Sequence, residues 1–294
     1  MVRRIALFLL INFLIVITIS IVLSLLGVQP YLTPYGLDIK ALLIFCLIWG
    51  ICGALISLAL SRKIAKWLMR IQLVDQKGPY ASLYQAVEKL SKKAKLPSVP
   101  EVGIFESSQM NAFATGPTKK RSLVAVSTGL MQKMNSEELE AVLAHEITHI
   151  ANGDMVTMTL IQGVVNAFVM FLARLLAYAI SFAGRSNERR SSYGTFYILT
   201  ILFEIVFMIL GTMVVGYFSR QREFRADRGG ALLTQPGSMI GALELLKRTQ
   251  ALPKKSSISA LMISMPSKKG LFRLFATHPP LEERIKRLEK MKVR

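Results

Sequence analysis

The sequence predicts an α+β chain that is mostly helical, carries a small β-sheet and is anchored in a membrane by up to four helices. Three observations support this fold class. The chain is 52% hydrophobic and has a mean hydropathy of +0.43. Four of its apolar runs reach the length of about 20 residues that a helix needs to cross a bilayer. The polar segments combine helical periodicity with short β-branched runs.

The four apolar runs cover residues 5–26, 41–60, 155–183 and 196–218. A cleaved signal peptide is an alternative for the first run, but its apolar stretch is too long and no small-residue cleavage site follows it. We therefore expect a retained anchor. As a helix, the third run would be about 43 Å long, against a bilayer core of about 30 Å. It must tilt, protrude from the bilayer or fail to span it.

The formal net charge is +19. A charge of this size can indicate nucleic-acid binding, but the chain has no basic module interleaved with aromatic residues, so we expect no nucleic-acid partner. Anionic lipid headgroups are the better match. Basic residues flank the first two runs, and the positive-inside rule then places the N-terminus and the segment after residue 61 in the cytoplasm. We expect a multi-pass protein of the bacterial inner membrane with its active domain in the cytoplasm. These residues are Arg3, Arg4, Arg62, Lys63, Lys66 and Arg70.

The apolar runs divide the chain into four parts. Residues 1–60 hold two N-terminal transmembrane helices, 61–154 a first polar part, 155–218 a transmembrane hairpin, and 219–294 a second polar part. Neither polar part alone is large enough for an independent core. Together they make about 170 residues, a normal domain size. We expect them to fold as one cytoplasmic domain that the hairpin interrupts.

The polar parts predict both helices and strands. Helical spacing predicts a helix over residues 80–95. Short runs predict strands at 102–105, 112–115 and 123–127, with Gly116-Pro117 as the turn between the last two. A second helix is expected over 136–151, ending at Asn152-Gly153-Asp154. Residues 253–266, rich in lysine and serine, predict a loop.

The helix at 136–151 contains the pattern His145-Glu146-Ile147-Thr148-His149, and the whole chain has only three histidines. Residues four apart share one face of a helix, so both imidazoles can reach one metal ion. Glu146 lies beside the first of them, where it can take a proton from water that the metal activates. A coincidental histidine pair is the alternative, and the well-capped helix around the pattern argues against it.

A catalytic zinc site needs a third protein ligand. The extended motif of the metzincins would need a glycine and a third histidine after His149, but Asn152 and Met155 occupy those positions. Glu223 is the other candidate, because two antiparallel helices would return it to the level of the first helix. Asp227, four residues further on, could then bind a ligand imidazole or a nearby helix. The alternative for Glu223 is an exposed, salt-bridged glutamate.

The third and fourth apolar runs contain one charged residue each. Arg174 and Glu204 are each 15 positions from residue 189, the centre of the connecting loop. Antiparallel helices therefore set them at a similar depth, and unpaired charges in hydrocarbon are costly. We expect the two side chains to form an ion pair; the alternative is that Arg174 snorkels to the interface or lies in a hydrated groove.

These motifs occur in an order that resembles the HtpX family of membrane-bound zinc metalloproteases over essentially the whole chain. The shared elements are Asn111-Ala112-Phe113-Ala114-Thr115-Gly116, the HEITH helix, Glu223-Phe224-Arg225-Ala226-Asp227 and Thr277-His278-Pro279-Pro280. The resemblance implies a gluzincin-like, zincin-type metalloprotease domain with one zinc ion per chain. It also implies that His145, His149 and Glu223 bind the zinc and that Glu146 is catalytic.

The resemblance further implies a zinc endopeptidase that hydrolyses misfolded or damaged membrane proteins in quality control and the stress response. Its partners would be unfolded or membrane protein substrates and the lipid bilayer. Substrate backbone is expected to add as a strand beside Asn111, Ala112, Phe113 and Ala114. His278 is a candidate for transition-state support, as are Arg225 and Arg228; alternatively, His278 is an ordinary loop residue.

Two other classes of function are open at this point. One is a non-proteolytic membrane scaffold or chaperone with a structural metal site, although such a site has no use for a carboxylate at Glu146. The other is a metal transporter, although Arg174 would place a positive charge in the path of a cation.

Overall fold

The structure, a computed structural model, describes residues 21, 25, 31–33, 36–182, 189–251 and 274–292. Apart from residues 21 and 25, the predicted span at 5–26 lies outside this part of the chain, as does the predicted loop at 253–266. The chain divides into two compact units. We call Met1–Ser57 with Met158–Val215 the membrane unit, and Leu58–Thr157 with Gly216–Arg294 the polar unit.

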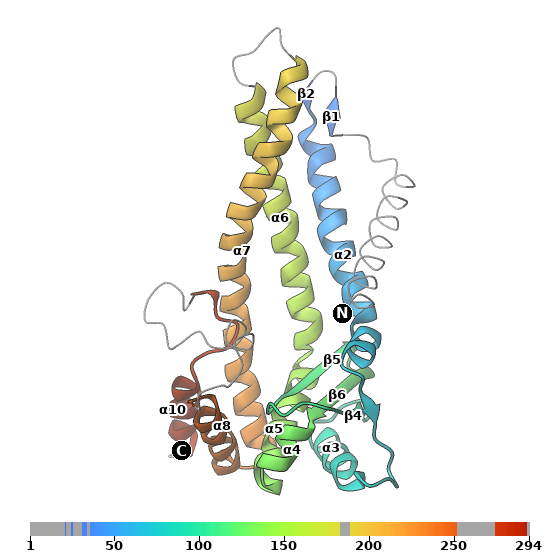
Figure 1. The fold of residues 1–294 in the computed structure, drawn as a ribbon, viewed down its shortest axis with the longest axis vertical. Helices are drawn as coiled ribbons and strands as arrows, with labels where there is room; N and C mark the ends of the chain where they lie inside the picture. Colours follow the sequence, from blue (N-terminus) through green and yellow to red (C-terminus); the bar gives the residue numbers. More distant parts are fainter. Residues whose placement is uncertain are drawn as a thin grey trace. The chain divides into compact units, whose positions relative to one another are not determined.

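Three helices in the described ranges are long and apolar enough to cross a membrane (Figure 1). They are α2 (Ile39–Leu68), α6 (Asp154–Phe182) and α7 (Arg189–Leu233). The second, third and fourth predicted runs lie in these helices. The helix α7 continues far beyond residue 218, where the apolar run ends, because no proline interrupts the sequence before Pro236. Its polar end belongs to the polar unit.

The membrane unit contains the ion pair that the sequence predicts. Arg174 Nη1 lies 2.5 Å from Glu204 Oε1, which confirms the contact and the antiparallel alignment of α6 and α7. The guanidinium also lies over the ring of Phe45 on α2, 5.8 Å from its centroid. The arginine therefore contacts two neighbouring helices. A short hairpin of β1 (Leu32–Thr33) and β2 (Gly36–Leu37) precedes α2.

We predict that Arg174→Ala and Glu204→Ala each lower the thermal stability of the protein in detergent. Each single change leaves the other charge without its partner, so the double variant should cost less than the sum of the two. Thr212→Ala, an exposed change on the same helix α7, is the control and should have little effect. Strictly additive losses would show that the pair contributes no coupling energy.

The polar unit contains a four-stranded sheet in the order β3-β4-β6-β5 (Figure 1). The strands are β3 (Gln72–Leu73), β4 (Glu101–Phe105), β5 (Ala112–Thr118) and β6 (Arg121–Ser127). β4 and β6 are parallel and the other pairs antiparallel. β5 is last in the order and is therefore an edge strand. The three predicted strands are confirmed. The fourth, β3, has only two residues, too few for a sequence pattern.

The predicted turn at Gly116-Pro117 is wrong. Both residues lie within β5, and the chain turns at Lys119 and Lys120 instead. The register shifts between Thr115 and Thr118, and this bulge accommodates a proline that has no N–H to donate. Gly116 has φ 144°, a conformation that other residues rarely adopt.

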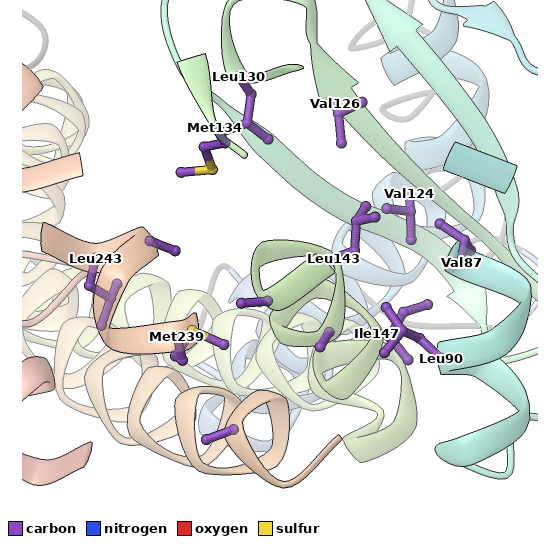
Figure 2. Close-up of a cluster of buried hydrophobic side chains, with 14 of the residues drawn as sticks. Val87, Leu90, Val124, Val126, Leu130, Met134, Leu143, Ile147, Met239 and Leu243 are labelled. Atoms are coloured by element: carbon purple, nitrogen blue, oxygen red, sulfur yellow. The ribbon is translucent and has the colours of Figure 1, made fainter. Parts of the chain in front are cut away.

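Helix α5 (Ser136–Asn152) is the centre of the polar unit. Its N-terminus has a capping box, in which Asn135 and Glu138 each accept a hydrogen bond from the other's backbone, and its C-terminus ends at Gly153 in the left-handed conformation. In Figure 2, Leu143 and Ile147 lie between the sheet and the neighbouring helices. In its described residues the unit also contains α3 (Ala81–Lys93), α4 (Thr128–Lys133), α8 (Pro236–Ala251), α10 (Leu281–Lys292) and the ends of α2, α6 and α7.

Candidate metal centre

Helix α5 presents His145 and His149 on one face, both buried. Their Nε2 atoms are 3.1 Å apart. The helix is packed on several sides, and α7 approaches it closely at Gly230, where an added Cβ would lie 3.1 Å from the backbone nitrogen of His145. The two imidazoles are therefore held in place by the packing of the helix that carries them.

Glu223 completes a cluster of three possible ligands. It lies on α7, is 1% exposed, and its carboxylate faces both histidines. Its Oε2 lies 3.6 Å from His145 Nε2, and its Oε1 lies 3.4 Å from His149 Nε2. The sequence left open whether Glu223 is an exposed, salt-bridged residue; its burial excludes that alternative.

The geometry of the cluster fits a tetrahedral metal ion. Ligand atoms at zinc–nitrogen distances of about 2.0–2.1 Å stand about 3.3 Å apart in a tetrahedron. The two Nε2 atoms here are 3.1 Å apart, close to that value. Each of them faces a different oxygen of Glu223, His149 at 3.4 Å from Oε1 and His145 at 3.6 Å from Oε2, and one ligand atom from each of the three residues lies within 4.8 Å of the others. In addition, Glu223 Oε1 is buried and makes no hydrogen bond; besides His149 its charged neighbour is Arg222, whose Nε lies 3.5 Å away.

Each histidine has a carboxylate behind its other ring nitrogen. His149 Nδ1 pairs with Asp154 Oδ2 at 2.7 Å. His145 Nδ1 lies 3.0 Å from Asp227 Oδ1, an ion-pair contact rather than a well-aligned hydrogen bond. Such partners orient a metal-binding imidazole and leave its Nε2 for the ion. The sequence predicted the role of Asp227 but not that of Asp154, which lies at the first position of α6, just after the helix break.

Arg284 is a buried member of the site that the sequence did not reveal. It lies on α10 and forms two hydrogen bonds to Asp227, at 2.7 and 2.6 Å. Its Nη1 also lies 3.8 Å from Glu223 Oε2. The helical pattern could have indicated that Arg284 is buried, because it shares a face with the buried residue Leu288 four positions later. A charge on the buried face of a helix indicates a buried partner.

The electrostatics of the cluster favour positive charge at its centre. Burial would lower the pKa of both imidazoles. Asp227 and Glu223 outweigh burial at His145 and raise its pKa to about 9. Asp154 and Glu223 similarly raise the pKa of His149 against burial. Burial raises the pKa of Glu223, but the three histidines overcome it and hold that pKa well below its usual range.

The remaining candidate residues lie around this cluster. His278 Nδ1 is 2.9 Å from Glu223 Oε2, while 63% of the His278 side chain is exposed. Glu146 is half-buried on α5 and is not part of the cluster of three. Helix α5 packs along β5, the strand that begins at Ala112, so the exposed sheet edge and the cluster belong to neighbouring elements. Arg225 is 63% exposed and lies 3.8 Å from Asp154.

Comparison with known protein families gives two matches. The model of peptidase family M48 matches residues 79–292, which include the whole cluster. The model of the RDD family matches residues 1–91.

Several similar proteins are described as HtpX proteases. The chain is 48% identical to a protease HtpX homolog of Thiobacillus denitrificans, covering 96% of this chain and 97% of that protein. It is also 48% identical to protease HtpX of Hahella chejuensis, with the same coverage. A protease HtpX homolog of Paracidovorax citrulli is 50% identical, with 98% of each chain covered.

Among solved structures, the crystal structure of Ste24p from S. mikatae has a similar fold. The TM-score is 0.67 at 17% sequence identity, and the match covers 98% of this chain. The chain spans 65% of the length of Ste24p. At this identity the likeness concerns the fold alone.

Apolar helices, a small α+β unit and a buried cluster on an HExxH helix together define a membrane-embedded metallopeptidase. The chain belongs to peptidase family M48 and, within it, to the HtpX family of proteases.

We predict that Asp154→Asn weakens metal binding about 10–100-fold, the usual effect of removing the partner of a metal-binding histidine. Asn cannot accept the Nδ1 proton of His149 as strongly as a carboxylate does. Competition with a chelator of known affinity measures the change. Asp75→Asn, at an exposed aspartate of the same unit, is the control. Equal affinities for Asp154→Asn and the wild type would show that Asp154 does not orient His149.

Proposed function

We propose that the protein is a zinc endopeptidase of the bacterial inner membrane that hydrolyses peptide bonds in misfolded or damaged membrane proteins on the cytoplasmic side. The observation that carries this proposal is the separation of roles on α5. His145 and His149 belong to a three-residue cluster with metal-binding geometry, whereas the half-buried Glu146 between them remains free to act on substrate. Three protein ligands with a fourth position left open are typical of catalytic zinc.

The zinc ion would be held by His145, His149 and Glu223. When bound, it would lower the pKa of a water molecule and polarise the scissile carbonyl. Glu146 accepts the proton of the attacking water and later delivers it to the leaving amine. His278 lies against Glu223 with most of its ring exposed, so it offers a donor that can stabilise the developing oxyanion.

The edge strand β5 is the proposed substrate-binding strand. An extended peptide can add to an open sheet edge through backbone hydrogen bonds, which do not require a particular sequence. The N–H of Ser127 donates to Asn111 O, and hydrogen-bonded pairs recur at every second position of an antiparallel ladder. Phe113 therefore pairs inward with Ala125, while the backbone groups of Ala112 and Ala114 face outward. These two residues are the ones that would bind substrate backbone.

The orientation follows from charge near α2. Arg62, Lys63, Lys66 and Arg70 lie at or just after the end of this helix, and basic residues favour the cytoplasmic side. Arg62 and Lys66 also pair with Glu101 of β4, at 3.2 and 2.7 Å, so the end of α2 is tied to the sheet within the polar unit. Cytoplasmic placement gives the site access to unfolded segments of membrane proteins.

We predict that Glu146→Gln keeps the zinc and lowers the cleavage rate of an unfolded substrate such as casein by about 100-fold or more, the usual contribution of a general base. The change removes the base but no ligand. His145→Ala, His149→Ala and Glu223→Ala should lose both zinc and activity. Zinc content and cleavage are measured on the same preparations. Undiminished zinc-dependent cleavage by Glu146→Gln would exclude the proposed mechanism.

We predict that Ala114→Pro strongly reduces cleavage while leaving zinc content unchanged, because it removes an outward-facing backbone donor from the edge of the sheet. Ala114→Val keeps that donor and is the matched control. Phe113→Pro is a less specific probe, since it would also break pairing with β6. Normal cleavage of unfolded substrate by Ala114→Pro would rule out strand addition at this edge.

A further inference from the structure

One face of α7 pairs step by step with the segment that leads into α10. Gly216, Arg220, Glu223 and Asp227 recur at helical spacing, so they lie on one face of the helix. Opposite them, in chain order, lie Leu274, Ala276, His278 and Arg284. The last two steps belong to the metal centre. The first two have no role in the mechanism described above.

The contacts at these first two steps are made with the backbone. Arg220 Nη1 donates to Leu274 O at 3.0 Å and to Ala276 O at 2.6 Å. An added Cβ at Gly216 would lie 2.9 Å from Leu274 O and 3.0 Å from the same Arg220 nitrogen. The absence of a side chain at Gly216 therefore lets the segment lie close to the helix, where the guanidinium can reach both carbonyls.

We infer that Gly216 and Arg220 are positioning residues for His278, an inference that rests on the proposed function. Arg220 lies three residues before Glu223, and Ala276 lies two residues before His278. The Arg220 hydrogen bonds therefore set the position of the His278 backbone through short connections on both sides. They hold the ring against Glu223 at the edge of the active site.

The contacts around Arg220 indicate that it positions His278 rather than stabilising the unit as a whole. Helix α10 is anchored independently, by the two hydrogen bonds between Arg284 and Asp227 and by its packing on α8. Loss of Arg220 therefore releases the segment before His278 but leaves α10 in place. The three residues of the metal cluster make no contact with Leu274 or Ala276 among the described interactions, so zinc binding is retained.

Steady-state cleavage by the full-length protein in detergent, with variants at Arg220 and His278, tests the inference. Arg220→Ala should lower kcat about tenfold or more, with KM, zinc content and thermal stability close to those of the wild type. Arg220→Lys, which keeps a donor, should recover part of the loss. Because Arg220 acts through His278, the double variant with His278→Ala should be no slower than His278→Ala alone. Multiplying losses would overturn the inference.

Two further substitutions test the geometry. Gly216→Ala should reproduce the loss seen with Arg220→Ala, because its Cβ displaces both the guanidinium and the segment. Gly241→Ala on α8 is the matched control, since its Cβ would meet Glu138 only at ordinary contact distance. Arg248→Ala, at an exposed arginine of α8, controls for the loss of a charge. Full activity of Gly216→Ala would contradict a close approach at this position.

A readout that needs no turnover comes from the histidines themselves. The chain has only three, so their imidazole NMR signals can be assigned with single variants. In the zinc-loaded protein, Arg220→Ala should shift the His278 signal and leave those of His145 and His149 unchanged. An unmoved His278 signal would overturn the inference. If the wild type instead failed to cleave substrate, the proposed function would be wrong, while the spectrum would still decide the positioning.

Discussion

The need to bury two imidazoles and a carboxylate beside one another governs the structure of the polar unit. Ionisable groups out of contact with water are costly unless each has a partner. Here Asp154 forms an ion pair with His149, Asp227 forms one with His145, and Arg284 forms one with Asp227. The partners come from α6, α7 and α10. A single helix carrying HExxH could not provide them, so the site requires elements that are far apart in the sequence.

This requirement explains why the last part of the chain belongs to the site although it supplies no ligand to the cluster. Arg284 neutralises Asp227, so the carboxylate can stay charged and buried beside His145. His278, from the same part of the chain, lies against the carboxylate of Glu223. The carboxylates of Glu223 and Asp227 on α7 are thus both paired with side chains of one continuous segment, which carries His278 and Arg284. The position of that segment also depends on contacts made outside the metal centre.

The sequence predicted the elements whose information is local. HExxH, three of the four strands and α5 follow from spacing and composition, and the Arg174–Glu204 pair follows from symmetry about the loop. Asp154 and Arg284 could not be predicted in the same way, because each gains its role only when distant helices pack together. The misplaced turn at Gly116-Pro117 has a similar cause. This dipeptide is a strong turn signal, but a β-bulge satisfies it equally well, and pairing with β6 decides between the two.

The edge strand and the metal-binding helix are coupled by the hairpin that joins β5 to β6. Lys119, in that turn, donates to the carbonyl of Ala151 at 2.5 Å and so caps the end of α5, two residues beyond His149. At the other end of β5, Asn111 is bound to Ser127, whose side chain also caps α4. Both ends of the strand are therefore fixed to elements that pack around α5. Under the proposed function, a peptide added along β5 would lie on a strand whose hairpin is bound to the helix that carries His145, His149 and Glu146. Under the same proposal, this coupling would let the backbone of a bound peptide, rather than any one of its side chains, bring the scissile bond to the site.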